Sequence, residues 1–162
     1  MTDGGTSVPE VQRLLAVLAV GRRVAEIGTA FGEGAAALAE TAASVVTVEL
    51  DPGRAAAARE RLDGLENVEA LEGDWIEFLP ERAPFELVFW DGGGWKHDPA
   101  GTVGDAAIDL LVPGGLLVSD DFTPGRSIES DPARKFLLGH PKLVATEVTV
   151  SPGMAAIVAA RR

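Results

Sequence analysis

The chain has 162 residues, a formal net charge of −11 and no cysteine. This length suits one domain with a hydrophobic core of its own. The acidic balance argues against a nucleic-acid substrate, because phosphate binding needs a basic surface. The lack of cysteine excludes disulfide bonds, thiol catalysis and cysteine-based zinc sites. A negative field favours a cationic cofactor and divalent metals, although many proteins carry such a charge without either ligand.

No apolar run approaches the ~20 residues that a membrane span needs. Residues 1–7 are small and polar and lack the basic and apolar blocks of a signal peptide. We therefore expect a cytoplasmic protein with no membrane partner. No repeat, linker or low-complexity tract divides the chain. Residues 1–162 are accordingly predicted to form a single domain, with residues 1–7 as a flexible tail.

Helical and strand patterns alternate from the first predicted helix onward. Apolar residues at helical spacing predict helices over residues 8–20, 35–41, 52–62, 104–111 and 131–138, with one further helical turn at 76–79 before Pro80. Short apolar and β-branched runs predict strands over residues 24–27, 44–50, 67–71, 85–90, 116–118, 143–150 and 154–160.

This alternation predicts an α/β fold, a Rossmann-like doubly wound sheet of seven mostly parallel strands with helices on both faces. The join at residues 151–153 is short enough for a hairpin, so the last strand should run antiparallel. Ligands in such sheets bind beyond the carboxyl ends of the strands. Asp91, Asp120 and Asp121 follow strands at these ends, so we expect them to share one site.

The most informative local motif is the glycine-rich loop from Gly28 to Gly34, between the first predicted strand and a helix. This arrangement lets a backbone close tightly over a ligand. Its spacing fails the dinucleotide fingerprint at Ala30, where a second glycine is required. Glu26 adds a carboxylate directed at the same pocket, which suits a cation and repels a pyrophosphate. S-adenosylmethionine fits these features, because it carries a sulfonium and an ammonium and no phosphate. The alternative is that the loop is an ordinary glycine-rich turn without a ligand.

Three residues after the next strands suggest how a nucleoside would be held. Glu49 ends the second predicted strand, where a carboxylate can accept both ribose hydroxyls of a dinucleotide or of adenosylmethionine. Asp74 and Trp75 follow the third strand and could bind an adenine amino group and cover its ring. The alternative for each acidic residue is a solvated position at the end of a strand.

Four stretches together resemble the class I S-adenosylmethionine-dependent methyltransferases, and within them the catechol and caffeoyl-CoA type O-methyltransferases. These are the loop segment 26–34, the segment 49–52, Leu-Val-Phe-Trp-Asp ending at Asp91, and Val-Pro-Gly-Gly-Leu-Leu-Val-Ser-Asp-Asp at 112–121. The resemblance extends over nearly the whole chain. It implies S-adenosylmethionine as cofactor, bound around Glu26, Gly28, Thr29, Ala30, Phe31, Gly32, Gly34, Glu49, Leu50, Gly73, Asp74, Trp75 and Asp91.

The resemblance also implies a divalent metal held by Asp91, Asp120 and Asp121. Three carboxylates at neighbouring strand ends repel one another unless a cation or a proton intervenes, and hard oxygen ligands suit Mg²⁺ or Ca²⁺. The family usually has Asp-Asn where this chain has Asp120-Asp121, which puts the identity of the metal in doubt. The alternatives to a metal site are that Asp121 caps the segment that follows it and that Asp120 is simply solvated.

Lys96 is the candidate base, with Asp91 as the second catalytic residue. In the catechol type a Trp-Lys pair closely follows the metal aspartate, and the lysine acts as base. Here Trp95-Lys96 is offset by two residues after a run of three glycines, so a solvated loop lysine is the alternative. His97 is a weaker candidate for the base, and Trp95 is expected to line the substrate site or to pack the loop. His140 is interpreted as structural.

The predicted activity is methyl transfer from S-adenosylmethionine to a hydroxyl of a small, aromatic or vicinal acceptor, assisted by Mg²⁺ or another divalent cation. Two alternatives stay open: a protein that binds S-adenosylmethionine without metal-dependent catalysis, and an NAD-dependent oxidoreductase on a similar fold. Relatives carry additional N-terminal helices that form an acceptor lid. Without them, the acceptor site is open or is completed by a second subunit, so a homodimer is a candidate assembly.

Overall fold

The computed structural model describes residues 7–92, 94–97 and 102–162. Within them, the α-helices are α1 (Pro9–Leu18), α2 (Glu33–Ala39), α3 (Pro52–Leu62), α4 (Trp75–Arg82), α5 (Thr102–Asp109) and α6 (Pro132–Gly139). The strands are β1 (Arg23–Ile27), β2 (Ser44–Glu49), β3 (Val68–Glu72), β4 (Phe85–Trp90), β5 (Leu111–Phe122), β6 (Leu143–Ser151) and β7 (Met154–Arg161). Two short 3₁₀ helices that the pattern did not predict are η1 (Gly94–Lys96) and η2 (Ile128–Ser130).

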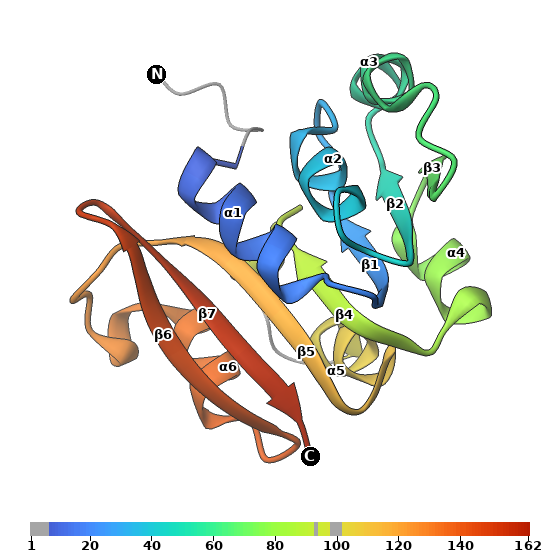
Figure 1. Cartoon of the computed structure of the whole chain (residues 1–162). Helices are drawn as coiled ribbons and strands as arrows, with labels where there is room; N and C mark the ends of the chain where they lie inside the picture. The colour runs from blue at the N-terminus through green and yellow to red at the C-terminus, as the bar shows by residue number, and fades with distance from the viewer. Residues whose placement is uncertain (1–6, 93, 98–101) are drawn as a thin grey trace.

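The strands of the described chain form one seven-stranded sheet in the order β3-β2-β1-β4-β5-β7-β6 (Figure 1). The pairs from β3 to β5 are parallel, and β7 runs antiparallel to both β5 and β6. The predicted Rossmann-like sheet with an antiparallel last strand is therefore confirmed. The chain order reverses between β1 and β4, and ligands of open α/β sheets bind at the carboxyl ends of such a pair.

Helices cover the two faces of the sheet in two groups. In Figure 1, α1, α2 and α3 lie in front of the sheet, and α5 and α6 lie behind it. Leu15 of α1 packs in one cluster with Phe89 of β4. On the opposite face, Ile108 of α5 and Leu137 of α6 belong to the cluster that contains Trp90. Successive residues of β4 thus face opposite layers, so β4 is buried on both sides.

The fourth helix is longer than the single turn predicted at 76–79. It spans Trp75–Arg82 and contains Pro80. The carboxylate of Asp74 caps it by accepting the N–H of Ile76 at 3.0 Å. Leu79 is fully buried in the core, and this burial stabilises the helix although Pro80 lacks the N–H that an interior residue donates.

The fifth strand also begins earlier than predicted, at Leu111 and not at Leu116. Leu111 pairs with Phe85, and the register shifts before Leu116 pairs with Leu87. The intervening turn residues 113–115 therefore form an irregularity inside a strand, as bulges do, and do not end it.

β5 also ends later than predicted, at Phe122 and not at Val118, so Asp120 and Asp121 lie among its last residues and do not follow it. The other boundaries lie within a few residues of those predicted.

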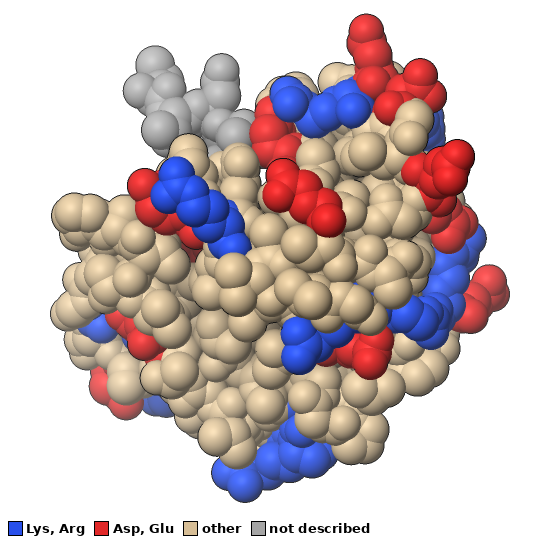
Figure 2. Space-filling view, in the orientation of Figure 1, with Lys and Arg blue, Asp and Glu red and all other residues tan. Residues whose placement is uncertain are grey.

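The charged side chains are unevenly distributed over the surface. Figure 2 shows acidic and basic groups gathered on the side of α3 and α4, whereas the surface over β6 and β7 is largely uncharged. Among the described residues, none of the helices combines the length and the apolar character needed to cross a bilayer.

Candidate active site

The loops after β1 and β4 touch each other through their backbones at the reversal point of the sheet. A Cβ built on Gly28, whose φ is +93°, would lie 2.3 Å from the Cα of Gly92. The N–H of Gly92 donates to the carbonyl of Ile27 at 2.7 Å, and the N–H of Gly28 donates to Val48 at 3.0 Å. These contacts require a residue without a side chain at both positions. The rim of the site is thus built from bare backbone.

Glu49 holds the glycine-rich loop from the end of β2. Its carboxylate accepts the N–H of Ala30 at 2.8 Å and that of Asp51 at 3.0 Å. Ala30 adopts a φ of 49°, a left-handed conformation that costs a non-glycine residue free energy. The bond to Glu49 stabilises this conformation. Glu49 therefore has a role in shaping the loop that the strand-end pattern did not reveal.

Glu26 lies under the loop and is only 1% exposed. Its carboxylate accepts the hydroxyl hydrogen of Thr47 at 2.5 Å. A Cβ on Gly34 would lie 2.3 Å from Glu26 Oε1, so the carboxylate sits against the first turn of α2. Burial raises the pKa of Glu26 well above its usual value, and the charges of Asp91 and Asp120 raise it further, while the Thr47 bond lowers it.

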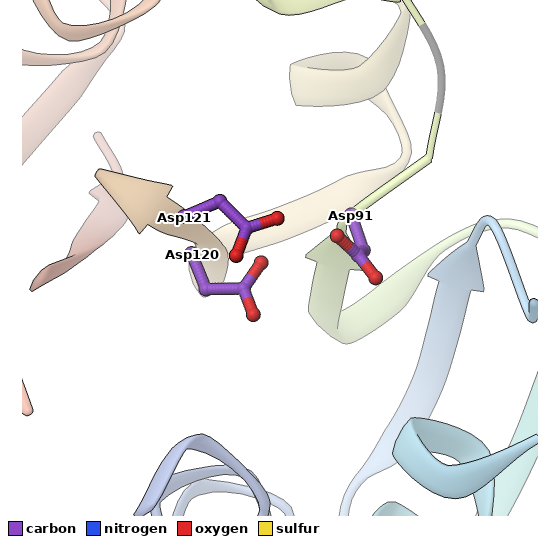
Figure 3. A group of neighbouring side chains, drawn as sticks. All are labelled: Asp91, Asp120 and Asp121. Atoms are coloured by element: carbon purple, nitrogen blue, oxygen red, sulfur yellow. The ribbon is translucent and has the colours of Figure 1, made fainter. Parts of the chain in front are cut away.

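The three predicted metal ligands converge at the ends of β4 and β5 (Figure 3). Asp91, Asp120 and Asp121 each offer one carboxylate oxygen, and these oxygens all lie within 4.8 Å of one another. Asp121 has a φ of 64°, a left-handed conformation that turns the backbone near the end of β5. Asp120 is 1% exposed, and its Oδ1 has no hydrogen-bond partner among the described residues.

The electrostatics of this cluster are unfavourable for three free carboxylates. Burial, with the charges of Asp91 and Asp121 added to it, raises the pKa of Asp120 to about 8. Burial also raises the pKa of Asp91, and the nearby Lys96 opposes this increase. A hard cation fits this donor set, because it would satisfy the unpaired oxygen of Asp120 and neutralise charges that otherwise repel.

Lys96 reaches the acidic cluster despite its offset in sequence. Its Nζ donates to the backbone carbonyl of Asp120 at 2.8 Å and lies 3.8 Å from Asp121 Oδ2. The neighbouring Trp95 positions Lys96 by stacking on Trp90, with ring centroids 3.9 Å apart and planes inclined by 16°. Trp95 thus packs the loop from a position in the core, as one of its two interpretations stated. His97 is exposed.

The residues expected around an adenine are more loosely arranged. Leu50 is 73% exposed, and Phe31 is 37% exposed. Asp74 caps α4, as described above, so one of its oxygens is already engaged. Trp75 packs edge-on against Trp90 at 6.0 Å. His140 lies away from the site and contacts Asp105 at 3.1 Å, in agreement with its structural interpretation.

Three residues of the site were not anticipated. Thr47 donates to Glu26 and contacts the hydroxyl of Thr29 at 2.5 Å. Ser119 donates to the carbonyl of Trp90 at 2.8 Å and so joins β4 to β5 directly behind the aspartates. A polar residue inside an otherwise apolar strand run was the available signal for Thr47. Gly92 was assigned only to a loop, and nothing in its sequence context marked the contact with Gly28.

Known proteins resemble this chain in sequence and in fold. The chain matches a family model described as a methyltransferase domain over residues 25–122, which includes the glycine-rich loop and the three aspartates. A protein-L-isoaspartate O-methyltransferase from Azorhizobium caulinodans is 34% identical over 127 residues, which cover 77% of this chain and 54% of that protein. The chain spans about half the length of the curated relatives it matches.

Two solved structures extend the similarity to the whole described fold. Cofactor-bound Rv0187 from MTB is 29% identical with a TM-score of 0.77, over 97% of this chain and 82% of that one. The O-methyltransferase TomG from Streptomyces achromogenes, solved in complex with SAM, is 27% identical with a TM-score of 0.73. That match covers 99% of this chain and 83% of TomG.

The Gly28 contact yields a stability prediction. Gly28→Ala should lower the free energy of unfolding by about 3 kcal/mol or more, because a positive φ and a backbone collision both oppose the added methyl group. Gly21→Ala is the matched control: its φ is +69° and no atom lies within 4 Å of the added Cβ. Urea unfolding of both variants should show the larger loss for Gly28→Ala. Equal losses would contradict the close approach.

Glu26 yields a pH prediction. Because its pKa is raised in the folded state, the native protein binds a proton that the unfolded chain releases near pH 4.3. Stability should therefore fall as the pH rises from that value through the folded pKa. Glu26→Gln should remove this contribution, and at pH values above the folded pKa of Glu26 the variant should be more stable than wild type. Thermal melts across pH would detect it.

Glu69→Gln is the matched control for this prediction, because the hydrogen bond from Arg82 lowers the pKa of Glu69. Its contribution has the opposite sign and is lost as the pH falls. A Glu26→Gln variant that is less stable than wild type throughout would contradict the assigned burial cost.

Proposed function

We propose that this chain, which belongs to the class I S-adenosylmethionine-dependent methyltransferases, methylates a hydroxyl group of a small aromatic or vicinal acceptor with the help of a divalent cation. The observation that carries the proposal is the convergence of Asp91, Asp120 and Asp121 beside Lys96 at the carboxyl edge of the sheet. This arrangement combines acidic ligands and a basic side chain where the fold binds its substrates.

The chemistry of a hydroxyl acceptor explains why such a cluster is useful. A phenol has a pKa near ~10 and is a poor nucleophile at neutral pH. Lys96 Nζ, as the neutral amine, would take the hydroxyl proton. The acceptor oxygen would then attack the methyl carbon as the carbon–sulfur bond breaks, leaving the sulfur neutral. A divalent cation held by the three aspartates would supply Lewis-acid stabilisation of that oxygen. The positive charge of the sulfonium and the negative charge of the acceptor oxygen are both lost in this step, so a water-poor site favours it.

The cofactor half of the proposal rests on the loop and on its buried acid. The backbone of the glycine-rich loop offers close approach at Gly28. Glu26 and Glu49 place two buried carboxyl groups beside it, and a cationic nucleoside would favour their ionised forms. The same charge disfavours the pyrophosphate of a nicotinamide cofactor. Membership of the methyltransferase family, together with the failed dinucleotide fingerprint, leaves the oxidoreductase alternative without support.

The curated relatives suggest a second acceptor class, because their names describe methylation of protein isoaspartate. A carboxylate acceptor is already ionised at neutral pH, so it needs neither a base nor a Lewis acid. The acidic cluster therefore favours a hydroxyl acceptor over a carboxylate.

The proposal is tested by incubating the protein with S-adenosylmethionine and a panel of catechols, other hydroxy-aromatics and an isoaspartyl peptide. Each reaction is run with Mg²⁺ and with a chelator, and methylated product is measured by mass spectrometry. We expect methylated hydroxy-aromatic that is lost under chelation. Product that is indifferent to chelation would remove the metal from the proposal, and methylated peptide alone would replace the acceptor class.

Asp91 is predicted to be essential for turnover. Asp91→Asn should abolish detectable methyl transfer, because it removes one charged ligand from the cluster. Binding of adenosylhomocysteine, measured by calorimetry, should remain detectable. Asp109→Asn is the control, since Asp109 is exposed and pairs with Lys142 at 3.1 Å, away from the cluster. An Asp91→Asn variant with normal turnover would show that the mechanism is wrong.

Lys96 is predicted to act in the proton transfer. Lys96→Gln should lower kcat by about 10²- to 10⁴-fold, the contribution typical of a positioned general base. Lys142→Gln makes the same change in charge at an ion pair elsewhere on the chain and should leave kcat unchanged. Rates are compared at saturating acceptor. A kcat within threefold of wild type for Lys96→Gln would remove Lys96 from the reaction.

A further inference from the structure

The two edges of the sheet differ in how they are protected. At one edge, β3 is five residues long, and its Glu69 and Glu72 form ion pairs with Arg82 at 2.7 Å and Arg59 at 3.2 Å. Short strands and charged side chains are devices that keep an edge from pairing with another chain. The β3 edge is thus protected against association.

The other edge carries fewer of these devices, namely one inward-drawn carboxylate and a register shift near its end, between Thr149 and Ser151. β6 is nine residues long, contains no lysine, arginine or proline, and pairs only with β7 in the described chain. Its single charged side chain, Glu147, is drawn inward by Arg134, whose Nε donates to it at 2.8 Å. The carbonyl of Leu143 accepts from Arg162 Nε at 3.3 Å at the start of this strand. Beyond it, a long edge rich in β-branched residues presents backbone donors and acceptors to a further strand.

One face beside this edge is also apolar and incompletely covered. In Figure 1, α6 lies behind β6 and β7, and α1 approaches their other face only near the hairpin. Within the described chain, Val144 is 56% exposed and Val148 is 37% exposed on that face. Figure 2 shows few charged side chains there. In a chain of net charge −11, this is a surface at which two copies can meet with little repulsion.

We propose that β6 pairs antiparallel with β6 of a second copy of this chain, about a two-fold axis at Thr146, to form a symmetric dimer with one continuous sheet. This register places Val144 opposite Val148 of the second copy and Thr146 opposite its own equivalent. Both are favourable cross-strand pairs. It also places Glu147 opposite Ala145. A shift of the axis to Glu147 would set two carboxylates against each other, which destabilises a pair.

The size of the interaction is sufficient for a dimer. Pairing of residues 143–149 with their equivalents gives roughly seven backbone hydrogen bonds, within the range of about 10 ± 5 found in protein interfaces. The valine pairs would add apolar burial on the exposed face. A two-fold contact of this kind uses the same surface on both copies and closes on itself, so it does not propagate into a fibre.

Cross-linking tests the register, since the chain has no cysteine of its own. Thr146→Cys should form a covalent dimer under mild oxidation, because directly opposite Cβ atoms lie about 4.5–5.5 Å apart. Val148→Cys is the matched control on the same face: its two copies would be offset by four residues, roughly 13 Å, beyond disulfide reach. Equal cross-linking of both variants, or none of Thr146→Cys, would overturn the proposal.

Sedimentation tests the assembly without a covalent bond. The wild-type chain should sediment as a dimer, and Thr146→Lys should sediment as a monomer, because it sets two like charges opposite each other at the axis. Val17→Lys introduces the same charge at a valine of α1 that is 69% exposed and should remain dimeric. Circular dichroism checks that each variant folds. A monomeric wild type, or a Thr146→Lys variant that stays dimeric while folded, would overturn the proposal.

Discussion

The carboxyl groups gathered at the carboxyl edge of the sheet are the constraint around which the rest of the molecule is arranged. Glu26, Glu49 and Asp120 are each at least nine-tenths buried at or beneath this edge, where water cannot screen them. Hydrogen bonds from backbone and hydroxyl groups satisfy the first two. Asp120 keeps one oxygen without a partner among the described residues. Burial raises the pKa of Glu26 and of Asp120, and a bound cation would favour the ionised form of both groups.

The same edge explains why two loops carry glycines at their contact. The crossing of Gly28 and Gly92 joins the loops after β1 and β4 at the point where strand order reverses. Ser119 then ties β4 to β5 just behind the aspartates. Rigid strands thus position the carboxylates of Asp91 and Asp120, and the loops above supply backbone. Sites built on strand ends hold their groups more precisely than sites built on loops alone.

The fold was largely predictable because its signals are local. Alternating strand and helix patterns were enough to predict the sheet, and the short join at 151–153 was enough to predict its antiparallel last strand. The two short 3₁₀ helices and the full extents of α4 and β5 were not predicted. The helix that contains Pro80 persists because Leu79 is buried, and β5 starts before its glycines because Leu111 pairs with Phe85. Both depend on tertiary contacts that a pattern along the chain does not encode.

The acidic members of the site were predictable from their positions at strand ends, whereas the contacts among them were not. Thr47 acts through Thr29 and Glu26, which are 18 and 21 residues away, and Gly92 acts through the still more distant Gly28. Neither Thr47 nor Gly92 stands in a recognised motif. Lys96 could be named as a candidate, but its reach to Asp120 depends on the stacking of Trp95 on Trp90. Such three-dimensional coincidences become visible only once the chain is folded.

The central claim is that Asp91, Asp120 and Asp121 together hold a divalent cation. The most direct measurement is a crystal structure of the chain with adenosylhomocysteine and Mn²⁺, with anomalous scattering used to locate the metal. The account predicts one manganese peak within about 2.0–2.6 Å of an oxygen from each aspartate. Clear density for adenosylhomocysteine with no anomalous peak between these carboxylates would contradict it.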